Sequence, residues 1–336
     1  MKHHHRPRHL AAKTMGALAI GALALTACTT PTGTPTSNGT EAPQELTTVK
    51  TVTMSVSGTH WREIVAQAKG FFKDEGLDIE ETVANPQISV DAVISGDVQI
   101  GFSDTAKSIQ ATEKGADLEI VASGMDKANY AFVGGIGINS IQDLKGKTIA
   151  AAGATDVYTQ VIFDILKNAG VDPSEVNFTY GQNSNDRAAA LQGGAIQGAL
   201  IPPPADHRLE AAGLKILART ADLVPFLSLS STVVQKSWAA DHGDIIKKYI
   251  KAIAKATDWL YDPANKDEAI QILADATKSS VEDSTSAYDD YITAKAFNVG
   301  ACVQSDAVKV LLEKMSGLGL LDTTDPNQFI TTEYCS

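Results

Sequence analysis

The sequence predicts an α/β protein with two similar lobes, each a mostly parallel sheet flanked by helices. Segments typical of strands and helices alternate along the chain, and parallel neighbours need crossover helices between them. Two short motifs also recur in the same order in two regions. Gly-[Leu/Val]-Asp stands at 76–78 and 170–172, and Gly-x-[Val/Ile]-Gln stands at 96–99 and 194–197. Because the order of elements around the motifs matches as well, the chain is expected to contain two related units.

In the first unit, apolar residues alternate with others and then recur at three- and four-residue spacing, as in a strand followed by a helix. The elements expected in order are strand 50–56, helix 59–72, strand 77–80, helix 89–94 and strand 98–104.

The second unit repeats this order after a stretch that links the two. Its expected elements are strand 147–152, helix 156–166, strand 176–180, helix 186–191 and strand 196–201. Amphipathic stretches at 244–260, 266–276 and 306–315 predict C-terminal helices that pack on the first lobe.

The first 27 residues are typical of an export signal. A basic leader precedes an apolar segment, 15–25, that is too short to span a bilayer. The segment ends in LTAC at 25–28, which resembles a bacterial lipoprotein signal whose cysteine becomes acylated. We expect a signal peptide over 1–27, a lipid anchor on Cys28 and a location outside the cytoplasm, anchored to the cell membrane. An ordinary cleaved signal with a chance cysteine is the alternative.

Composition limits the structure and the partners that the rest of the chain can have. Residues 28–48 are rich in Thr, Pro, Ser and Gly, and are expected to form a flexible linker.

The formal net charge is −12. Removal of the leader takes away four basic residues and no acids, so the mature charge is about −16. Such an acidic surface argues against a nucleic-acid partner.

Cysteine usage and the absence of familiar motifs limit the chemistry. Cys302 and Cys335 are the cysteines left after Cys28, and in an exported protein they predict one disulfide, with two free thiols as the alternative. The sequence has no Cys/His cluster at zinc spacing and no nucleophile elbow, phosphate loop or dinucleotide fingerprint. We therefore expect no metal, no cofactor and no catalytic residues.

Four motifs carry a resemblance to a known family, the nitrate/sulfonate/taurine-type solute-binding proteins of ABC importers. They are GFFKDEGLDI at 70–79, SGDVQIG at 95–101, LKGKTIA at 144–150, and GAIQGAL at 194–200 followed by two prolines. The resemblance covers most of residues 50–273. Gln99 and Gln197 depart from it, because the family usually carries Asp at these positions.

The resemblance implies a two-lobed periplasmic binding protein type II fold whose cleft closes on a ligand. Lobe 1 would comprise 49–132 and 231–336, and lobe 2 would comprise 133–230. The implied function is capture of a small solute, such as a sulfonate, taurine, nitrate or a pyrimidine. A monomeric, lipid-anchored protein would deliver it to an ABC importer permease.

Two other functions remain open on the same fold. One is a sensor subunit whose closed form docks on a receptor. The other is an enzyme similar to the pyrimidine synthase of thiamine synthesis, which uses a Cys-rich loop and a histidine. The chain has no Cys-rich loop, so a non-enzymatic role is expected.

Ligands of parallel α/β sheets gather where strands end and helices begin, and helix N-termini present free N–H groups there. Ser57 and Thr59 could instead only cap a helix, Trp61 could be a core residue, and Arg187 could be solvated. The residues expected to contact the solute are Ser57, Thr59, His60, Trp61, Ser103, Asp104, Thr105, Gly153, Ala154, Thr155, Tyr158, Asn183, Pro203 and Phe226.

Overall fold

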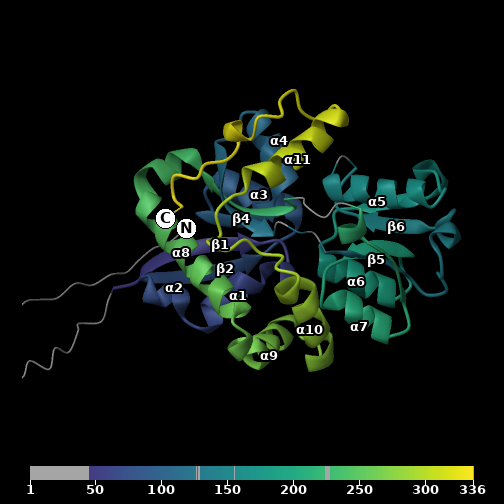
Figure 1. The fold of residues 1–336 in the computed structure, drawn as a ribbon. Helices are drawn as coiled ribbons and strands as arrows, with labels where there is room; N and C mark the ends of the chain where they lie inside the picture. Colours follow the sequence, from purple (N-terminus) through teal and green to yellow (C-terminus); the bar gives the residue numbers. More distant parts are fainter. Residues whose placement is uncertain (1–44, 126, 128, 155, 224–227, 336) are drawn as a thin grey trace, which may run out of the picture. The chain divides into compact units, whose positions relative to one another are not determined.

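The computed structural model describes residues 45–335 except 126, 128, 155 and 224–227. Within these residues, ten strands form two five-stranded sheets (Figure 1). The first sheet has the order β2-β1-β3-β10-β4, and the second has the order β7-β6-β8-β5-β9. The first contains β1 (Thr47–Thr53), β2 (Leu77–Val83), β3 (Ile100–Asp104), β4 (Leu118–Met125) and β10 (Ser230–Gln235). The second contains β5 (Ala131–Gly134), β6 (Thr148–Ala151), β7 (Asn177–Tyr180), β8 (Gly198–Ile201) and β9 (Lys215–Arg219).

The two sheets share one topology, which confirms the predicted α/β class. In each sheet four strands run in one direction, and the fifth, reversed strand is the first strand after the chain passes from one sheet to the other. That reversed strand is β10 in the first sheet and β5 in the second, and each pairs antiparallel with both neighbours. The sheets are therefore mixed, mostly parallel as predicted, with one reversed strand each, because each crossing brings the chain into its new sheet in the opposite direction.

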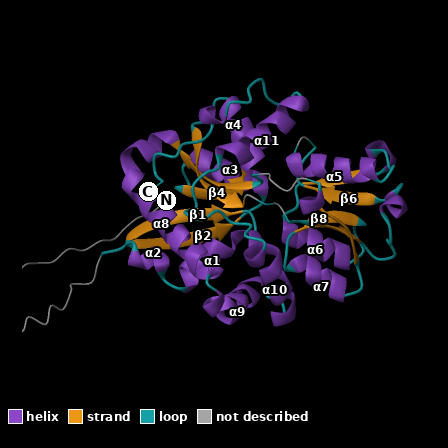
Figure 2. Cartoon of the chain, in the orientation of Figure 1, coloured by secondary structure: helices purple, strands orange, loops and turns teal. Residues whose placement is uncertain are grey.

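Helices pack against both sheets (Figure 2). Contacts with the first sheet and its surroundings come from α1 (Trp61–Ala68), α2 (Phe71–Asp74), α3 (Pro86–Ser95), α4 (Thr105–Glu113), α8 (Lys236–Tyr261), α9 (Lys266–Thr277), α10 (Val281–Tyr288) and α11 (Ser305–Gly317). The second sheet carries α5 (Val157–Asn168), α6 (Ser184–Gln192) and α7 (Ala205–Ala211). No helix of the described chain has the length and hydropathy required to cross a bilayer.

Several boundaries differ from those expected, for local reasons. Strand β1 starts at Thr47, inside the expected linker, because its first residues pair with Leu77 and the residue after it. The expected helix 59–72 is broken into a 3-10 turn, α1 and α2, since Gly70 adopts a left-handed conformation at φ 75°. The second sheet begins at Ala131, two residues before the expected start of lobe 2.

Short polar side chains fix the helix starts that follow strands. Asp104 caps α4 by accepting a hydrogen bond from the Lys107 N–H at 2.9 Å, and Asp156 caps α5 in the same way from Tyr158. Asn183 caps α6. These caps satisfy N–H groups that a helix leaves free at its first turn. They also hold polar side chains at the carboxyl ends of the strands.

The C-terminal segment covers one edge of the first sheet. Strand β4 is the edge strand, and Ile120 donates to Phe329 O at 2.9 Å while Thr331 donates to Ile120 O at 3.0 Å. A disulfide joins Cys302 and Cys335, whose Cα atoms are 5.7 Å apart. The end of the chain is thereby tied to a loop before α11.

Candidate functional site

A cavity of about 30 Å³, lined by polar and apolar groups alike, lies where strands of both sheets end. We call it the cleft cavity. Its walls combine hydroxyl and charged groups with apolar and aromatic side chains, the mixture typical of sites for small organic molecules. The lining residues are Met54, Ser55, Thr59, Pro86, Phe102, Asp104, Tyr130, Ala152, Tyr158, Asn183, Ser184 and Arg187.

Direct hydrogen bonds join the two halves of the cleft. Ser184 Oγ lies 3.0 Å from Ser55 Oγ, and the Gly58 N–H donates to Pro203 O at 3.0 Å. A side chain at position 58 would collide with the Tyr291 ring and would lie 2.7 Å from Pro203 O. Glycine therefore permits this close approach of the two backbones.

Two buried carboxyl groups stand beside the cavity. Asp104 is 1% exposed, and burial together with the charge of Asp156 raises its pKa to about 8. Burial also raises the pKa of Asp156, although Lys107 Nζ lies 3.6 Å from Asp156 Oδ2. Like-charged carboxylates in a place of low solvation disfavour ionisation of both. The site therefore holds titratable acids whose charge a ligand can change.

Arg187 is buried in the wall of the cavity and is tied to the backbone. Its Nε donates to Leu200 O at 3.2 Å, and its Nη1 donates to Gln182 O at 2.7 Å. Burial lowers the pKa of this guanidinium. The expectation of a solvated arginine is wrong, because Arg187 lies on the buried face of α6 with Ser184 and Leu191.

Two tyrosines form an aromatic part of the wall. The rings of Tyr130 and Tyr158 meet edge to face with centroids 5.3 Å apart, and their hydroxyls lie 3.4 Å apart. The Tyr158 hydroxyl also donates to Leu229 O at 3.2 Å. Burial raises the pKa of both phenols, so they act as neutral groups at physiological pH.

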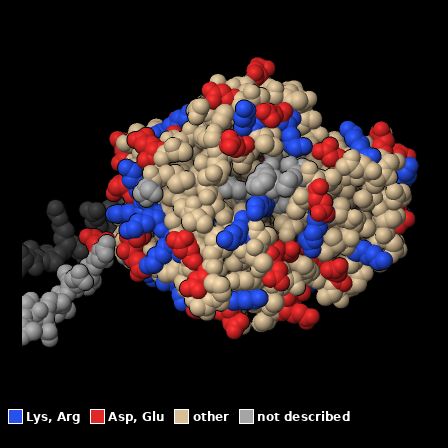
Figure 3. Space-filling model, in the orientation of Figure 1, with Lys and Arg blue, Asp and Glu red and all other residues tan. Residues whose placement is uncertain are grey.

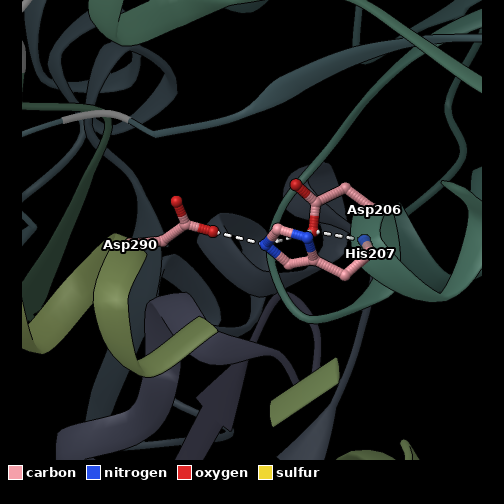
Figure 4. A group of neighbouring side chains, drawn as sticks. All are labelled: Asp206, His207 and Asp290. Atoms are coloured by element: carbon pink, nitrogen blue, oxygen red, sulfur yellow. Dashed lines mark hydrogen bonds and ion pairs between the residues drawn. The ribbon is translucent and has the colours of Figure 1, made fainter. Parts of the chain in front are cut away.

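A second polar cluster lies outside the cleft cavity (Figure 4). His207 on α7 points its Nε2 at Asp290 Oδ2, 2.6 Å away, and Asp206 stands beside it. Three such side chains could hold a metal ion by distance alone. However, the Arg219 guanidinium pairs with Asp206 Oδ2 at 3.0 Å and already supplies a positive charge. The cluster is better described as a group of ion pairs that links α7 to the π-helical turn Asp289–Thr293.

The structure brings only some of the expected contact residues to the cavity. Four of them line it: Thr59, Asp104, Tyr158 and Asn183. Two more lie beside lining residues. The Pro203 carbonyl accepts a hydrogen bond from the N–H of Gly58, which precedes Thr59, and Gly153 follows Ala152 in the chain. Ala154 is exposed. Thr155 and Phe226 lie outside the described residues, as does the predicted anchor Cys28.

Other expected residues support the first sheet instead. Trp61 is fully buried and packs edge to face on Tyr288, so its alternative role as a core residue is the one observed. His60 is buried, bonds Glu81 at 2.7 Å and packs its ring behind Phe102, a lining residue, with ring centroids 4.8 Å apart. Three buried hydroxyls bond other hydroxyls: Ser57 to Thr59, Ser103 to Ser89, and Thr105 to Ser231.

Sequence reasoning missed several lining residues. Ser184 and Arg187 share one helical face with Leu191, and this spacing could have identified a buried arginine. Tyr130 lies in the segment between β4 and β5, which links the two sheets. This segment has no hydrophobic periodicity from which a side chain that faces a ligand could be predicted. Met54, Pro86 and Phe102 are apolar residues that sequence alone cannot separate from the core.

Comparison with known proteins gives matches over most of the chain. The family model described as "NMT1/THI5 like" matches residues 57–266. A 4-amino-5-hydroxymethyl-2-methylpyrimidine phosphate synthase of Candida albicans is 27% identical over 214 residues, which cover 58% of this chain and 62% of the synthase. The chain thus matches less than two thirds of that relative's length.

A bacterial relative and a solved structure match over a larger share. YtlA of Bacillus subtilis, which carries the name of a binding protein, is 23% identical over 249 residues, 71% of this chain and 72% of YtlA. The ligand-binding component of an ABC-type import system from Staphylococcus aureus, solved with zinc bound, has a TM-score of 0.72 at 14% identity. That match covers 85% of this chain and 97% of the other, and at this identity it shows the fold alone.

Proposed function

The chain belongs to the NMT1/THI5-like family, and from that premise we propose that it is the solute-binding protein of an ABC importer. It captures a small organic solute of the sulfonate, taurine, nitrate or pyrimidine-like class outside the cytoplasm and passes it to a permease. The observation that carries the proposal is the cleft cavity, whose lining comes from strand ends of both sheets.

The contacts across the cleft support a cycle of opening and closing. Ser55 with Ser184, and Gly58 with Pro203, are hydrogen-bonded pairs that can form only when the halves are together. A solute that fills the cavity adds contacts to both halves and shifts the population towards the closed form. A permease that recognises only this form then receives loaded protein.

The sequence supports the location and partners. The signal over 1–27 would direct export and be removed, and the acylated Cys28 would hold the protein at the outer face of the membrane, with 28–48 as its tether, although β1 already begins at Thr47. Basic and acidic side chains are interspersed on the face drawn in Figure 3, and the net charge is negative, which disfavours nucleic acid as a partner. A monomer is sufficient for this function.

A thermal-shift panel on the chain without residues 1–27, with Cys28→Ser, tests the proposal. The panel contains alkanesulfonates, taurine, nitrate, bicarbonate and pyrimidines. A solute at about one hundred times its Kd adds about 2.7 kcal/mol to the free energy of unfolding, so the midpoint rises by several degrees. If no solute shifts the midpoint and native mass spectrometry finds no co-purified ligand, the proposal is contradicted.

An enzymatic function is the second candidate, because the Candida relative is named as a synthase. The cavity lining given above contains neither cysteine nor histidine, so Asp104 is the lining residue that could act as a general base. Prolonged incubation with the bound solute distinguishes the two functions. A binding protein returns the solute unchanged, whereas an enzyme releases a product of different mass.

A further inference from the structure

Asp104 is placed to contact a solute directly. It stands at the carboxyl end of β3 and at the start of α4, and it lines the cleft cavity. Its Oδ1 serves as the helix cap by accepting from the Lys107 N–H. Its Oδ2 is buried, and within the described part of the chain this oxygen has no hydrogen-bond donor.

The cations near Asp104 are engaged elsewhere. Lys107 Nζ is 3.6 Å from Asp156 Oδ2 on α5, and Arg187 on α6 donates its Nε and Nη1 to backbone carbonyls. The other groups that face this carboxyl are the buried Asp156 carboxyl and the neutral phenols Tyr130 and Tyr158. When Asp104 is ionised, its Oδ2 is a buried acceptor without a donor, which costs about 1–3 kcal/mol and favours the protonated form; a ligand that supplies the donor removes that cost.

Resting on the proposed function, we propose that Asp104 selects the solute through its free Oδ2, which accepts a hydrogen bond from a nitrogen-borne donor. The cleft thus takes solutes that carry an amino, ammonium or amidine-type group in preference to oxyanions that lack one. The rings of Phe102, Tyr130 and Tyr158 line the same cavity, and the face of an aromatic ring attracts a cationic nitrogen. Within the solute classes considered, this favours aminosulfonates and aminopyrimidines over nitrate and simple sulfonates.

Matched ligand pairs test the inference on the mature protein. Taurine is compared with ethanesulfonate, and 4-aminopyrimidine with 4-methylpyrimidine, by calorimetric titration at pH 7. In at least one pair the amino compound is expected to bind roughly ten- to one hundredfold more tightly, the range typical of a hydrogen bond to a charged group. This comparison needs no variant and remains decisive if a variant fails to fold.

The variant Asp104→Asn keeps an amide oxygen for the helix cap but places an N–H₂ donor where Oδ2 stands. The preference for the amino compound is expected to fall to less than about threefold. Asp172→Asn is the matched control, because Asp172 caps a 3-10 turn through Ser174 N at 2.8 Å and is exposed. That control should retain the wild-type preference.

Proton release gives an independent readout. Because Asp104 has a pKa of about 8, it is largely protonated in the free protein at pH 7, and an ammonium group that pairs with it displaces the proton. Calorimetric titrations with an ammonium-bearing solute, in buffers of different ionisation enthalpy, should show that the wild type releases a proton on binding. The variant Asp104→Asn should release none.

Two results overturn the inference. One is equal binding of both members of each pair, or tighter binding of the compound without nitrogen, which leaves the solute-binding function intact. The other is the absence of binding by both amino compounds. In that case nitrate, bicarbonate and the remaining panel decide separately whether the protein binds solutes at all.

Discussion

Asp104 also links the stability of the free protein to pH. Its pKa is raised to about 8 in the folded state, whereas an aspartate in an unfolded chain titrates near 4. A raised carboxyl pKa means that this residue's stabilising contribution is present below pH 4 and is lost as the pH rises through 8. The charged carboxylate thus destabilises the empty cleft at alkaline pH.

Asp104→Asn should therefore be more stable than the wild type at pH 9, by at least about 1.4 kcal/mol, the value of one pKa unit. At pH 5 the difference should be smaller by at least that amount. Urea unfolding at both pH values measures it, with Asp172→Asn as control. An unchanged difference between the two pH values would show that Asp104 titrates normally.

Single residues show where prediction from sequence stops. The position of Thr59, Asp104, Tyr158 and Asn183 in the cavity wall could be predicted, because strand ends and helix caps are visible in the sequence. Trp61 was misplaced, since the first turn of a helix can face either a cleft or the core, and the difference depends on the partner Tyr288, which is 227 positions away. Tertiary contacts of this kind leave no local signal.

At the scale of elements, helix caps set the geometry of the strand ends. Asn85 begins α3, and its Oδ1 accepts from Gln87 N at 3.0 Å and Ile88 N at 2.9 Å. Pro86 follows at the first helical position, which suits its fixed φ. This start places Pro86 in the wall of the cleft cavity.

Asn85→Ala should lower the free energy of unfolding by about 1 kcal/mol, because two helix N–H groups lose their acceptor. Chemical denaturation measures the loss, and Asn85→Asp, which retains a capping oxygen, is the control. Since Asn85 does not line the cavity, solute affinity should fall less than threefold. A loss of stability equal in both variants would contradict a capping role.

Most elements could be predicted from sequence, because alternation and three- or four-residue spacing report which face is buried. The order of strands within each sheet could not. The antiparallel insertion of β10 between β3 and β4 brings together segments more than 100 residues apart, and nothing in the local pattern specifies it. The repeat of motifs nevertheless implied that both sheets would share one topology, as they do.

At the scale of the whole molecule, ion pairs outside the cavity join α7 to the turn at Asp289–Thr293, and we expect them to favour the closed form of the proposed cycle. Burial opposes the charge of His207, but its hydrogen bond to Asp290 and the charge of Asp206 outweigh this effect and raise the pKa of His207. A raised histidine pKa means that the stabilisation is fully present below about pH 6.5 and is lost as the pH rises through the higher, folded-state value. Closure should therefore be favoured by mild acidity.

His207→Gln should weaken solute binding several-fold at pH 6 and less at pH 9. At pH 9 the wild-type His207 is neutral and no longer forms a charged pair with Asp290, so the substitution removes less. Affinity measured at both pH values tests this, for a solute whose own charge is constant over the range. His242→Gln is the control, since His242 stacks on Trp238 and does not belong to the cluster. An equal effect at both pH values would assign His207 a packing role only.

The segment that covers β4 has a consequence for how the protein must be made. An uncovered edge strand offers free N–H and C=O groups to the sheet of another copy, which is a common start of aggregation. Residues Phe329 and Thr331 occupy that edge, and the Cys302–Cys335 bond keeps the end of the chain from leaving it. Protein synthesised in a reducing compartment lacks this restraint, so we expect self-association that rises with concentration. Chains that fold after export, under oxidising conditions, should remain monodisperse in light-scattering measurements.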